Sequence, residues 1–550
     1  MKRFRKILPD NFRLVSVWII SVSKGVRRRM LTSCAVGICE VTCSLGFVWG
    51  SKSVIDIATG AKQGSLWEAA CFTGIFLAVQ LFFSAVDMWL SGSMPVDAGN
   101  LLRRRLFDRL LRSRWNELER FHTGDVINRI VQDVTEVVRF VTTVLPAVFV
   151  TGVQLLASFV FFCLLDASLA WLLAAVIPLF LLISKFYMGK MRRYTHDIRK
   201  SDSRIQAMIQ ESLQHRVVIK AMQRDAQRIG ALESMQTSLR GQVMRKTRLS
   251  LFSRIILGLG FNFGYLLVFL WGAVRLSMGS ISFGTMTAFL QLVGRVQRPA
   301  LDLTRLFPSF ITAYTAAERL MEIESLSAEA GVNPVIMEGK IGIRFDNVTF
   351  AYEEKSKKVI DALNLDLKPG TVTAIVGETG AGKTTLIRLI LALTDPVDGK
   401  ICLYNETKEV EVSPDTRVNL VYVPQGNTLF SGSIKENLLL GNPDATDEEL
   451  RIALEIAVAG FVFQLPGGVD TLIGESGSGL SEGQAQRIAI ARALLRPGGV
   501  LLFDEATSAL DMETESELLN NLRSFCAGKT IVFITHHRYL ARECDLTFSL

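Results

Sequence analysis

Gly377-Glu-Thr-Gly-Ala-Gly-Lys-Thr-Thr385 stands between an expected strand, Val372–Val376, and an expected helix, Leu386–Leu393. The stretch matches G-x-x-x-x-G-K-[ST] at every fixed position, in the strand–loop–helix context that this phosphate-binding loop requires. Backbone N–H groups can close around the β- and γ-phosphates, while Lys383 adds a positive charge and Thr384 offers a hydroxyl to Mg²⁺. We therefore expect ATP phosphates to bind along Gly377, Glu378, Thr379, Gly380, Ala381, Gly382, Lys383, Thr384 and Thr385.

A second carboxylate-bearing stretch, Val500-Leu-Leu-Phe-Asp504-Glu505, consists of apolar residues followed by two acids. A buried strand that ends at a metal site has this pattern. Asp504 is expected to hold Mg²⁺, directly or through water, and Glu505 to orient or deprotonate the attacking water. The alternative, a strand that simply ends in solvent, is weak in a chain that already carries the phosphate loop.

The first half of the chain has the composition of a membrane domain. The protein has 550 residues and a net charge of +8, and its mean hydropathy of +0.31 is high for a soluble protein. A spanning helix needs about 20 mostly apolar residues. Segments of that kind are expected at 30–50, 66–90, 140–164, 168–188, 251–274 and 283–307.

Basic residues lie mainly in two long connections, 95–139 and 189–250, which also show helical periodicity. The positive-inside rule places these connections and both chain ends in the cytoplasm. It explains the positive charge better than nucleic-acid binding, which we do not expect. The basic segment 1–29 is interpreted as an uncleaved lead-in helix. The eight cysteines show no zinc-binding spacing.

Charged side chains inside the expected spans need a reason, because each costs about 2.5–3.5 kcal/mol on insertion scales. Glu40 lies in the first span. Four more, Arg295, Arg298, Asp302 and Arg305, recur every three or four residues in the sixth and so share one helical face. They could form a net-basic stripe that favours an anionic or amphiphilic cargo. Alternatively, Asp302 pairs with Arg298 or Arg305 in a salt-bridge ladder.

Several further segments carry a family resemblance. Leu480-Ser-Glu-Gly-Gln484 resembles the signature loop of ATP-binding cassette (ABC) exporters. Segments 121–133 and 211–221 resemble the intracellular loops through which the exporters' membrane helices contact the nucleotide domain. The family most often has glycine where this chain has Glu482. Members also usually continue for a short helical stretch past the strand after His536, whereas this sequence ends at Leu550.

The resemblance implies roles for further residues. Tyr352 would stack on adenine, Gln425 would touch Mg²⁺, and His536 would act as the switch histidine, with His537 as its neighbour. In the signature loop, Ser481 and Gly483 would contact the γ-phosphate and Gln484 would belong to the same nucleotide-binding site. A helix at Ala485–Leu495 would direct its positive end toward that phosphate. Two loops, Ser508–Asp511 and Gly474–Gly477, would contact the partner subunit and the coupling helices, respectively.

The resemblance also implies an architecture: an all-α, six-helix transmembrane domain of the exporter type, followed by an α/β P-loop NTPase domain. We expect a lead-in helix at 1–29, the membrane domain at 30–320, a linker at 321–340 and the nucleotide-binding domain at 341–550. One phosphate loop and one signature cannot complete a site, so a second half-transporter is required, in a homodimer or a heterodimer.

The expected function is ATP-driven export of an amphiphilic substrate, such as a lipid, peptide or drug-like molecule, by alternating access. The expected location is a bacterial plasma membrane, in contact with lipid, with the nucleotide-binding domain in the cytoplasm. An ATP-gated channel or a regulatory subunit on the same scaffold is the alternative. Concentrative transport into inverted vesicles would distinguish the two.

Overall fold

The computed structural model describes residues 12–329, 333–352, 358–378, 380–474, 479–536 and 538–550, but not the side chains of 172–189 and of some other helical residues, Arg305 among them. The chain divides into two compact units. The first, called the membrane unit here, comprises Met1–Asp108 and Thr123–Ser325. The second, called the nucleotide unit, comprises Arg109–His122 and Leu326–Leu550.

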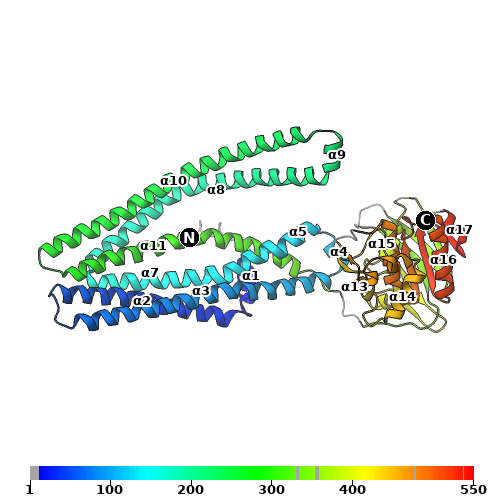
Figure 1. Cartoon of the computed structure of the whole chain (residues 1–550), viewed down its shortest axis with the longest axis horizontal. Helices are drawn as coiled ribbons and strands as arrows, with labels where there is room; N and C mark the ends of the chain where they lie inside the picture. Colours follow the sequence, from blue (N-terminus) through cyan, green and yellow to red (C-terminus); the bar gives the residue numbers. More distant parts are fainter. Residues whose placement is uncertain (1–11, 330–332, 353–357, 379, 475–478, 537) are drawn as a thin grey trace. The chain divides into compact units, whose positions relative to one another are not determined.

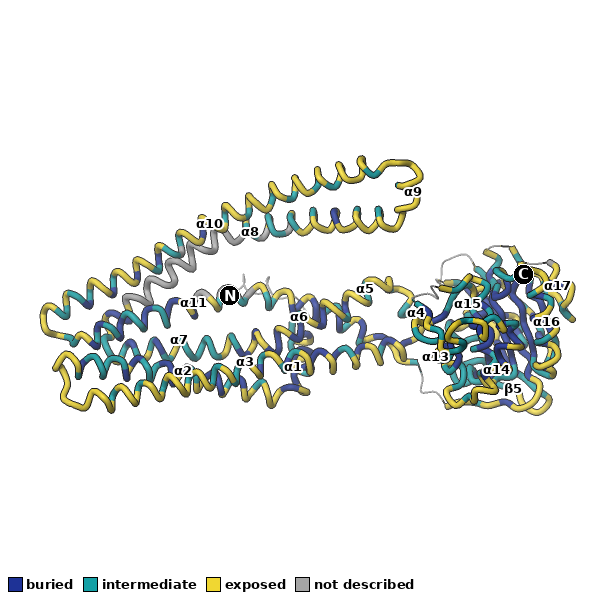
Figure 2. Tube along the Cα trace, in the orientation of Figure 1, coloured by how far each residue is buried: buried dark blue, intermediate teal, exposed yellow. Residues whose placement is uncertain are grey.

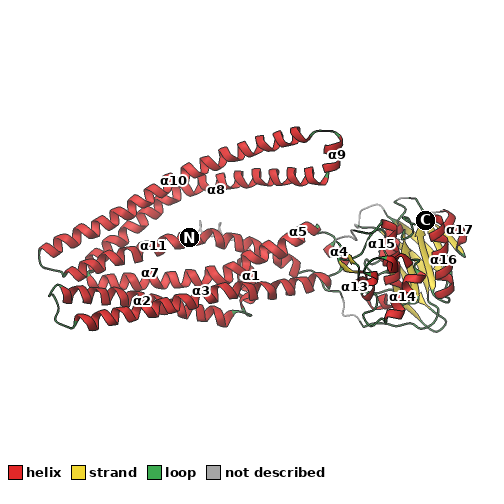
Figure 3. Ribbon diagram, in the orientation of Figure 1, coloured by secondary structure: helices red, strands yellow, loops and turns green. Residues whose placement is uncertain are grey.

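Long helices make up the membrane unit (Figures 1 and 3). Side-chain caps begin two of them, because Asp166 accepts hydrogen bonds from the backbone N–H groups of Ser168 and Leu169, and Ser282 accepts one from Thr285. The helices are α1 (Phe12–Ser23), α2 (Arg27–Ala58), α3 (Leu66–Leu111), α5 (Thr123–Asn128), α6 (Val134–Arg139), α7 (Leu145–Leu165), α8 (Ala167–Gln214), α9 (Arg216–Ala221), α10 (Asp225–Ser277) and α11 (Phe283–Glu324).

Two π-helical turns, η1 (Arg129–Asp133) and η2 (Phe140–Val144), join α5, α6 and α7. The resulting run, Thr123–Leu165, is one of four helices in the described chain that are long and apolar enough to cross a membrane. The others are α2, α3 and α10. The two remaining expected spans are 168–188 and 283–307. The first lies in α8, where the side chains of 172–189 are not described, and the second lies in α11 and contains the charged residues Arg295 and Arg298.

The buried Arg129 connects the start of the run Thr123–Leu165 to the end of α11 through hydrogen bonds. Arg129 is 8% exposed. Its guanidinium donates to Asp125 at 2.8 Å, to Glu322 at 2.6 Å and to the backbone carbonyl of Arg319 at 2.8 Å. Arg319 also pairs with Asp125 at 2.7 Å. A cation removed from water is thus compensated by two carboxylates and a carbonyl.

The nucleotide unit contains two main sheets. The antiparallel sheet has the order β2-β1-β4-β5, and the other sheet, in which every pairing is parallel, has the order β11-β3-β10-β9-β6. The strands of the first are β1 (Gly342–Phe350), β2 (Ile360–Leu367), β4 (Asp398–Tyr404) and β5 (Glu409–Glu411). Those of the second are β3 (Val372–Val376), β6 (Leu420–Val423), β9 (Val500–Asp504), β10 (Thr530–Thr535) and β11 (Leu546–Ser549).

Both faces of the parallel sheet are covered, which explains why its strands are apolar runs without alternation. Leu501 and Phe533 face one buried cluster, and Leu502 and Val532 face another. Figure 2 shows the buried strands in dark blue. The helices of this unit are α4 (Trp115–Leu118), α12 (Lys383–Ile390), α13 (Ile434–Leu439), α14 (Asp447–Ile456), α15 (Glu482–Leu494), α16 (Met512–Phe525) and α17 (Arg538–Glu543). The short strands β7 (Gly432–Ser433) and β8 (Leu472–Ile473) form an antiparallel pair.

Arg109–His122 is built into the nucleotide unit, although the residues on both sides of it in sequence belong to the membrane unit. Ser113 pairs with Ala328 in an antiparallel bridge. Glu117 accepts a hydrogen bond from the backbone N–H of Ser327 at 2.6 Å, and Asn116 donates to the hydroxyl of Thr394 at 3.1 Å. The contact with the nucleotide unit therefore precedes the segment 121–133 that sequence resemblance indicated.

Two helices begin earlier than expected, and both begin inside their motifs. Helix α12 begins at Lys383 rather than Leu386, because Gly382 adopts a left-handed φ of +97° and serves as its N-cap. Helix α15 begins at Glu482 rather than Ala485, because Ser481 caps it. The first-turn N–H groups of both helices, which have no partner within the helix, thus fall on the motif residues.

Candidate functional site

The parallel sheet brings the separate motifs to one edge. The carboxyl ends of neighbouring parallel strands meet on the same side of a sheet, where ligands of open α/β folds bind. Ile534 of β10 lies in register with Ile375 of β3 on one side and with Asp504 of β9 on the other. The phosphate loop, the Asp504–Glu505 pair and His536 therefore leave the sheet together, and Gln425 follows β6 beside them.

The phosphate loop is held by its own lysine. The ammonium of Lys383 donates to the backbone carbonyl of Gly377 at 3.0 Å. Gly380 and Gly382 have φ values of +91° and +97°, which side-chain-bearing residues rarely adopt. Thr384, the candidate metal ligand, is exposed, whereas Thr385 is buried. Glu378 is exposed and Ala381 half-buried, and the predicted residue Thr379 lies outside the described part of the chain.

Glu505 is the centre of the site. Its Oε1 lies 3.2 Å from the Lys383 ammonium and 3.6 Å from His536 Nδ1, and its Oε2 accepts a hydrogen bond from Gln425 at 2.9 Å. Its φ is +48°, an unusual value for a residue with a side chain. Such strained conformations concentrate at functional sites. The structure thus brings four predicted site residues into one cluster.

Asp504, one residue earlier, is buried at the end of β9. Burial raises the pKa of its carboxyl, and a hydrogen bond of 3.2 Å from the Tyr422 hydroxyl counteracts that shift. Burial, followed by the charge of Asp504, raises the pKa of Tyr422. Tyr422 is therefore a neutral hydroxyl that donates to the carboxylate and fixes its orientation.

Tyr352, the candidate adenine-binding residue, is 52% exposed. Its hydroxyl lies 3.0 Å from the hydroxyl of Thr385, and Arg388 of α12 donates to it at 3.3 Å. The guanidinium of Arg388 also lies over the ring, 6.0 Å from its centroid. Phe350 packs edge-on against the ring, with 5.1 Å between centroids. An open aromatic face is thus held beside the phosphate-loop helix.

The signature loop caps helix α15. Ser481 accepts a hydrogen bond from the backbone N–H of Gln484 at 3.2 Å, and the Gln484 side chain accepts one from Ser481 at 3.0 Å. A Cβ at Gly483 would lie 2.8 Å from the backbone carbonyl oxygen of Ala509. The glycine therefore permits close packing of the signature helix against the loop 508–511, whose Asp511 caps α16.

The signature and phosphate loops are not joined within one chain. In the described residues, Ser481 and Gln484 hydrogen-bond with each other through the capping box, and no hydrogen bond connects them to 377–385. Three of the loop residues expected beside the signature, 475–477, and the neighbour His537 lie outside the described residues.

Sequence reasoning missed Tyr422 and Arg388. Tyr422 pairs in register with Leu502, two residues before Asp504, and it is the one polar side chain in Leu420–Val423. A hydroxyl inside an aliphatic strand that precedes Gln425 could have drawn attention to it. Arg388 is the one basic residue of α12 after Lys383.

Comparison with known proteins supports one family for both units. The family model described as "ABC transporter transmembrane region" matches residues 30–299, and the one described as "ABC transporter" matches 360–508. The "Putative multidrug export ATP-binding/permease protein" of Staphylococcus aureus is 30% identical over 463 residues, which cover 83% of this chain and 79% of that protein.

A second relative and one solved structure are also similar to this chain. The "Uncharacterized ABC transporter ATP-binding protein YfiB" of Bacillus subtilis is 29% identical over 453 residues, covering 80% of this chain and 77% of that protein. The fold is shared with a bacterial Atm1-family ABC exporter solved with ATP bound, at a TM-score of 0.79 and 23% identity over 96% of this chain and 93% of that one. The chain belongs to the ABC transporter family, as a half-transporter of the exporter type that fuses a helical membrane domain to an ATP-hydrolysing domain.

Proposed function

We propose that two half-transporters, in the simplest case two copies of this chain, use ATP to export an amphiphilic substrate from the cytoplasm across a bacterial plasma membrane. The observation that carries the hydrolytic part is the contact of Glu505 with Lys383, Gln425 and His536, at 3.2, 2.9 and 3.6 Å. A carboxylate placed between a phosphate-binding lysine and a histidine can orient a water for attack on the γ-phosphate. The nearby Tyr352 would stack on adenine.

The residues at the edge of the parallel sheet fit Mg²⁺. This ion is usually held by one or two carboxylates together with substrate phosphates and water. Asp504, the exposed hydroxyl of Thr384 and the amide of Gln425 supply oxygen ligands of that kind. Among the described residues no cluster of three or more His, Cys, Asp or Glu side chains could hold a metal alone, so the phosphates would complete its shell. Bound there, Mg²⁺ would neutralise charge on the β- and γ-phosphates.

A second half-transporter would complete each ATP site. Ser481 and Gly483 present the positive N-terminus of α15, a natural place for a phosphate. Their separation from residues 377–385 in one chain supports a partner whose signature loop supplies this contact, as the family resemblance implies. Two ATP molecules would then join two nucleotide units. Glu505 and His536 are both present, so a homodimer would have two competent sites.

Exposed apolar residues at α9, the short helix that connects α8 to α10, also support a dimer. Val217 of the short helix α9 is 74% exposed, and Leu213 and Met222, on either side of α9 in sequence, are each 66% exposed. The nucleotide unit has a groove of about 520 Å³ beside Phe430 and Leu440, which are 65% and 60% exposed. We propose that α9 of each copy docks in this groove of the partner, so that closure of the nucleotide units moves the membrane helices.

The test of the hydrolytic assignment is Glu505→Gln in the purified, membrane-embedded protein. The variant should retain ATP binding, accumulate a closed dimer and lose turnover by a factor of about 100 or more, since the water is no longer oriented. ATP hydrolysis and cross-linking between the two nucleotide units are the measurements.

Glu448→Gln is the matched control, because Glu448 is an exposed carboxylate paired with Arg451 on α14. It should behave as the natural protein does. Normal turnover in Glu505→Gln would remove Glu505 from the proposed role. Hydrolysis without uptake into inverted vesicles would instead favour a channel or regulatory subunit.

A further inference from the structure

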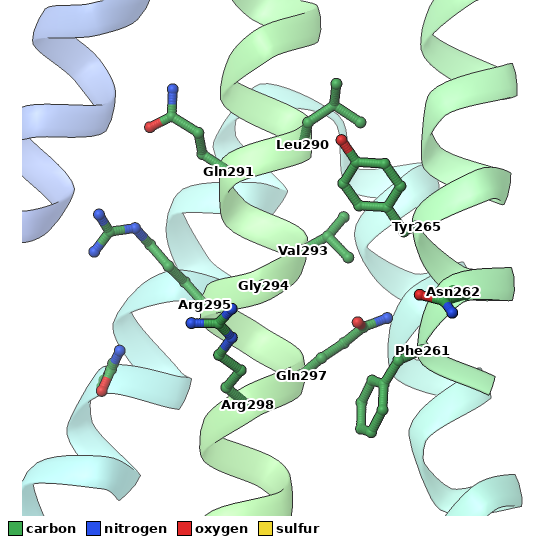
Figure 4. Close-up of a pocket in the computed structure, with 11 residues that line it drawn as sticks. Phe261, Asn262, Tyr265, Leu290, Gln291, Val293, Gly294, Arg295, Gln297 and Arg298 are labelled. Carbon is green, nitrogen blue, oxygen red and sulfur yellow. The ribbon is translucent and has the colours of Figure 1, made fainter. Parts of the chain in front are cut away.

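A cavity of about 720 Å³ lies within the membrane unit, beside α11. We call it the α11 cavity. A Cβ built at Gly294 would meet no atom within 4 Å, so the space beside this residue is open. The cavity is lined by Gln154 of α7, by Phe261, Asn262 and Tyr265 of α10, and by Leu290, Gln291, Val293, Gly294, Arg295, Gln297 and Arg298 of α11 (Figure 4).

The α11 cavity has two chemically different sides. Gln291, Arg295 and Arg298 recur at spacings of four and three residues, and Figure 4 shows them on one side of α11. On the other side, Leu290 and Val293 lie toward Tyr265 of α10 (Figure 4). A ligand that contacts both sides would combine a polar head with an apolar or aromatic body.

The polar side of the cavity lining carries two arginines and no acidic residue. None of the eleven lining residues carries a carboxylate. Within the described residues, neither Arg295 nor Arg298 forms an ion pair, so a salt bridge from Arg298 to Asp302 is not found; the side chain of Arg305 lies outside them. Cations at membrane depth normally pair with an opposite charge or mark a substrate pathway.

A buried amide adds an independent indication. Gln297 is 8% exposed and belongs to the lining of the α11 cavity. Figure 4 shows its side chain directed toward α10, where Asn262 and Phe261 lie. An amide in a cavity wall can donate to and accept from a ligand or water there.

We propose that the α11 cavity selects anionic amphiphiles. The head group, a carboxylate, sulfonate or phosphate, pairs with Arg295 and Arg298, whose guanidinium groups suit planar oxyanions. The body lies against Phe261 and Tyr265, and the Gln297 amide hydrogen-bonds a polar atom between head and body. This assignment rests on the proposed transport function, since it names the class of substrate that the membrane unit accepts.

The test compares three fluorescent probes that share one aromatic body and differ in charge: pyrene butyrate, pyrene butanol and pyrene butyl trimethylammonium. Binding to the full-length protein in zwitterionic nanodiscs is followed by fluorescence anisotropy without nucleotide. We expect the anion to bind about tenfold or more tightly than the alcohol, and the cation more weakly than both. Empty nanodiscs provide the lipid background.

Two test variants, each with its own control variant, locate the binding preference in the cavity. The double variant Arg295→Gln/Arg298→Gln should abolish the preference for the anion. Arg254→Gln removes a charge on α10 outside the cavity lining and should retain the preference. Gly294→Leu should fill the open space and weaken all three probes alike. Gly152→Leu is its control, because a Cβ there also meets nothing within 4 Å and Gly152 does not line the cavity. Thermal unfolding confirms that each variant is folded.

The inference is overturned if the three probes bind equally, or if the preference for the anion survives in the double arginine variant. Because binding is measured without ATP, this result leaves the proposed function intact. Conversely, absence of ATP-dependent uptake into inverted vesicles would remove the proposed function, while the binding series would still report on the cavity.

Discussion

Glu119, in the segment that follows α4, pairs with Arg388 of the phosphate-loop helix α12 at 2.9 Å. Arg388 in turn lies over the ring of Tyr352 and donates to its hydroxyl. One guanidinium therefore contacts both the segment that continues from membrane helix α3 and the proposed adenine-stacking residue. We expect this contact to transmit a change in nucleotide occupancy to that segment.

Glu119→Gln should weaken this transmission with little loss of stability. The pair is partly exposed, at 43% for Glu119 and 23% for Arg388, so its loss should lower the free energy of unfolding by at most about 1 kcal/mol. Transport per ATP hydrolysed should nevertheless fall. Lys435→Gln breaks another ion pair, with Asp447, and is expected to leave the ratio unchanged. An unchanged ratio in Glu119→Gln would reduce the contact to a surface ion pair.

Tyr422→Phe tests whether the hydroxyl positions Asp504. Removing a group that orients a metal-binding carboxylate typically costs about tenfold or more in metal affinity or activity. We expect ATP hydrolysis to require a higher Mg²⁺ concentration, which a titration of activity against Mg²⁺ would show. Tyr404→Phe loses a comparable hydrogen bond, of 2.6 Å to Asp366, in the antiparallel sheet. A shift of equal size in both variants would speak against a positioning role.

Gly483→Ala should disturb the signature helix despite the higher helix propensity of alanine. That propensity favours alanine by about 1 kcal/mol. The new Cβ would lie 2.8 Å from the carbonyl oxygen of Ala509, and overpacking against backbone costs about 1–3 kcal/mol. We expect a lower melting temperature and weaker ATP-dependent dimerisation. Gly460→Ala, where a Cβ would meet nothing within 4 Å, should be neutral.

Arg129→Ala should strongly destabilise the membrane unit. Removing one partner of a buried charge network leaves the others uncompensated and costs about 3–5 kcal/mol. Thermal unfolding in nanodiscs is the measurement. Arg139→Ala is the control, since Arg139 is 56% exposed and pairs with Glu136 at 3.6 Å, and its loss should cost less than about 1 kcal/mol. Equal losses would show that Arg129 does not hold the run to α11.

The parts of the fold that short-range sequence patterns determine were predictable. The expected strand Val372–Val376 has the bounds of β3, and the acidic pair lies at the end of the buried strand β9. The first residues of the helices were harder to predict from sequence, because the left-handed Gly382 and the Ser481 cap place the first turns of α12 and α15 inside the motifs. Capping depends on side-chain geometry that apolar periodicity does not register.

Contacts between residues far apart in sequence were not predictable from one chain. Tyr422 reaches Asp504 only because β6 and β9 pair in a particular register. The pairing of Arg388 with Glu119 joins residues 269 positions apart. The spacing of Arg295 and Arg298 indicated a shared helical face, but only the packing of α10 and α11 shows a cavity beside it.

The early placement of Arg109–His122 has a consequence for biosynthesis. The hydrogen bond of Glu117 can form only after the ribosome has added Ser327, 210 residues later. The nucleotide unit is therefore complete only when both of its parts, Arg109–His122 and Leu326–Leu550, are present. Expressed alone, Leu326–Leu550 would lack the strand-like partner of Ala328, and its surface around Thr394 and Arg388 would meet solvent instead.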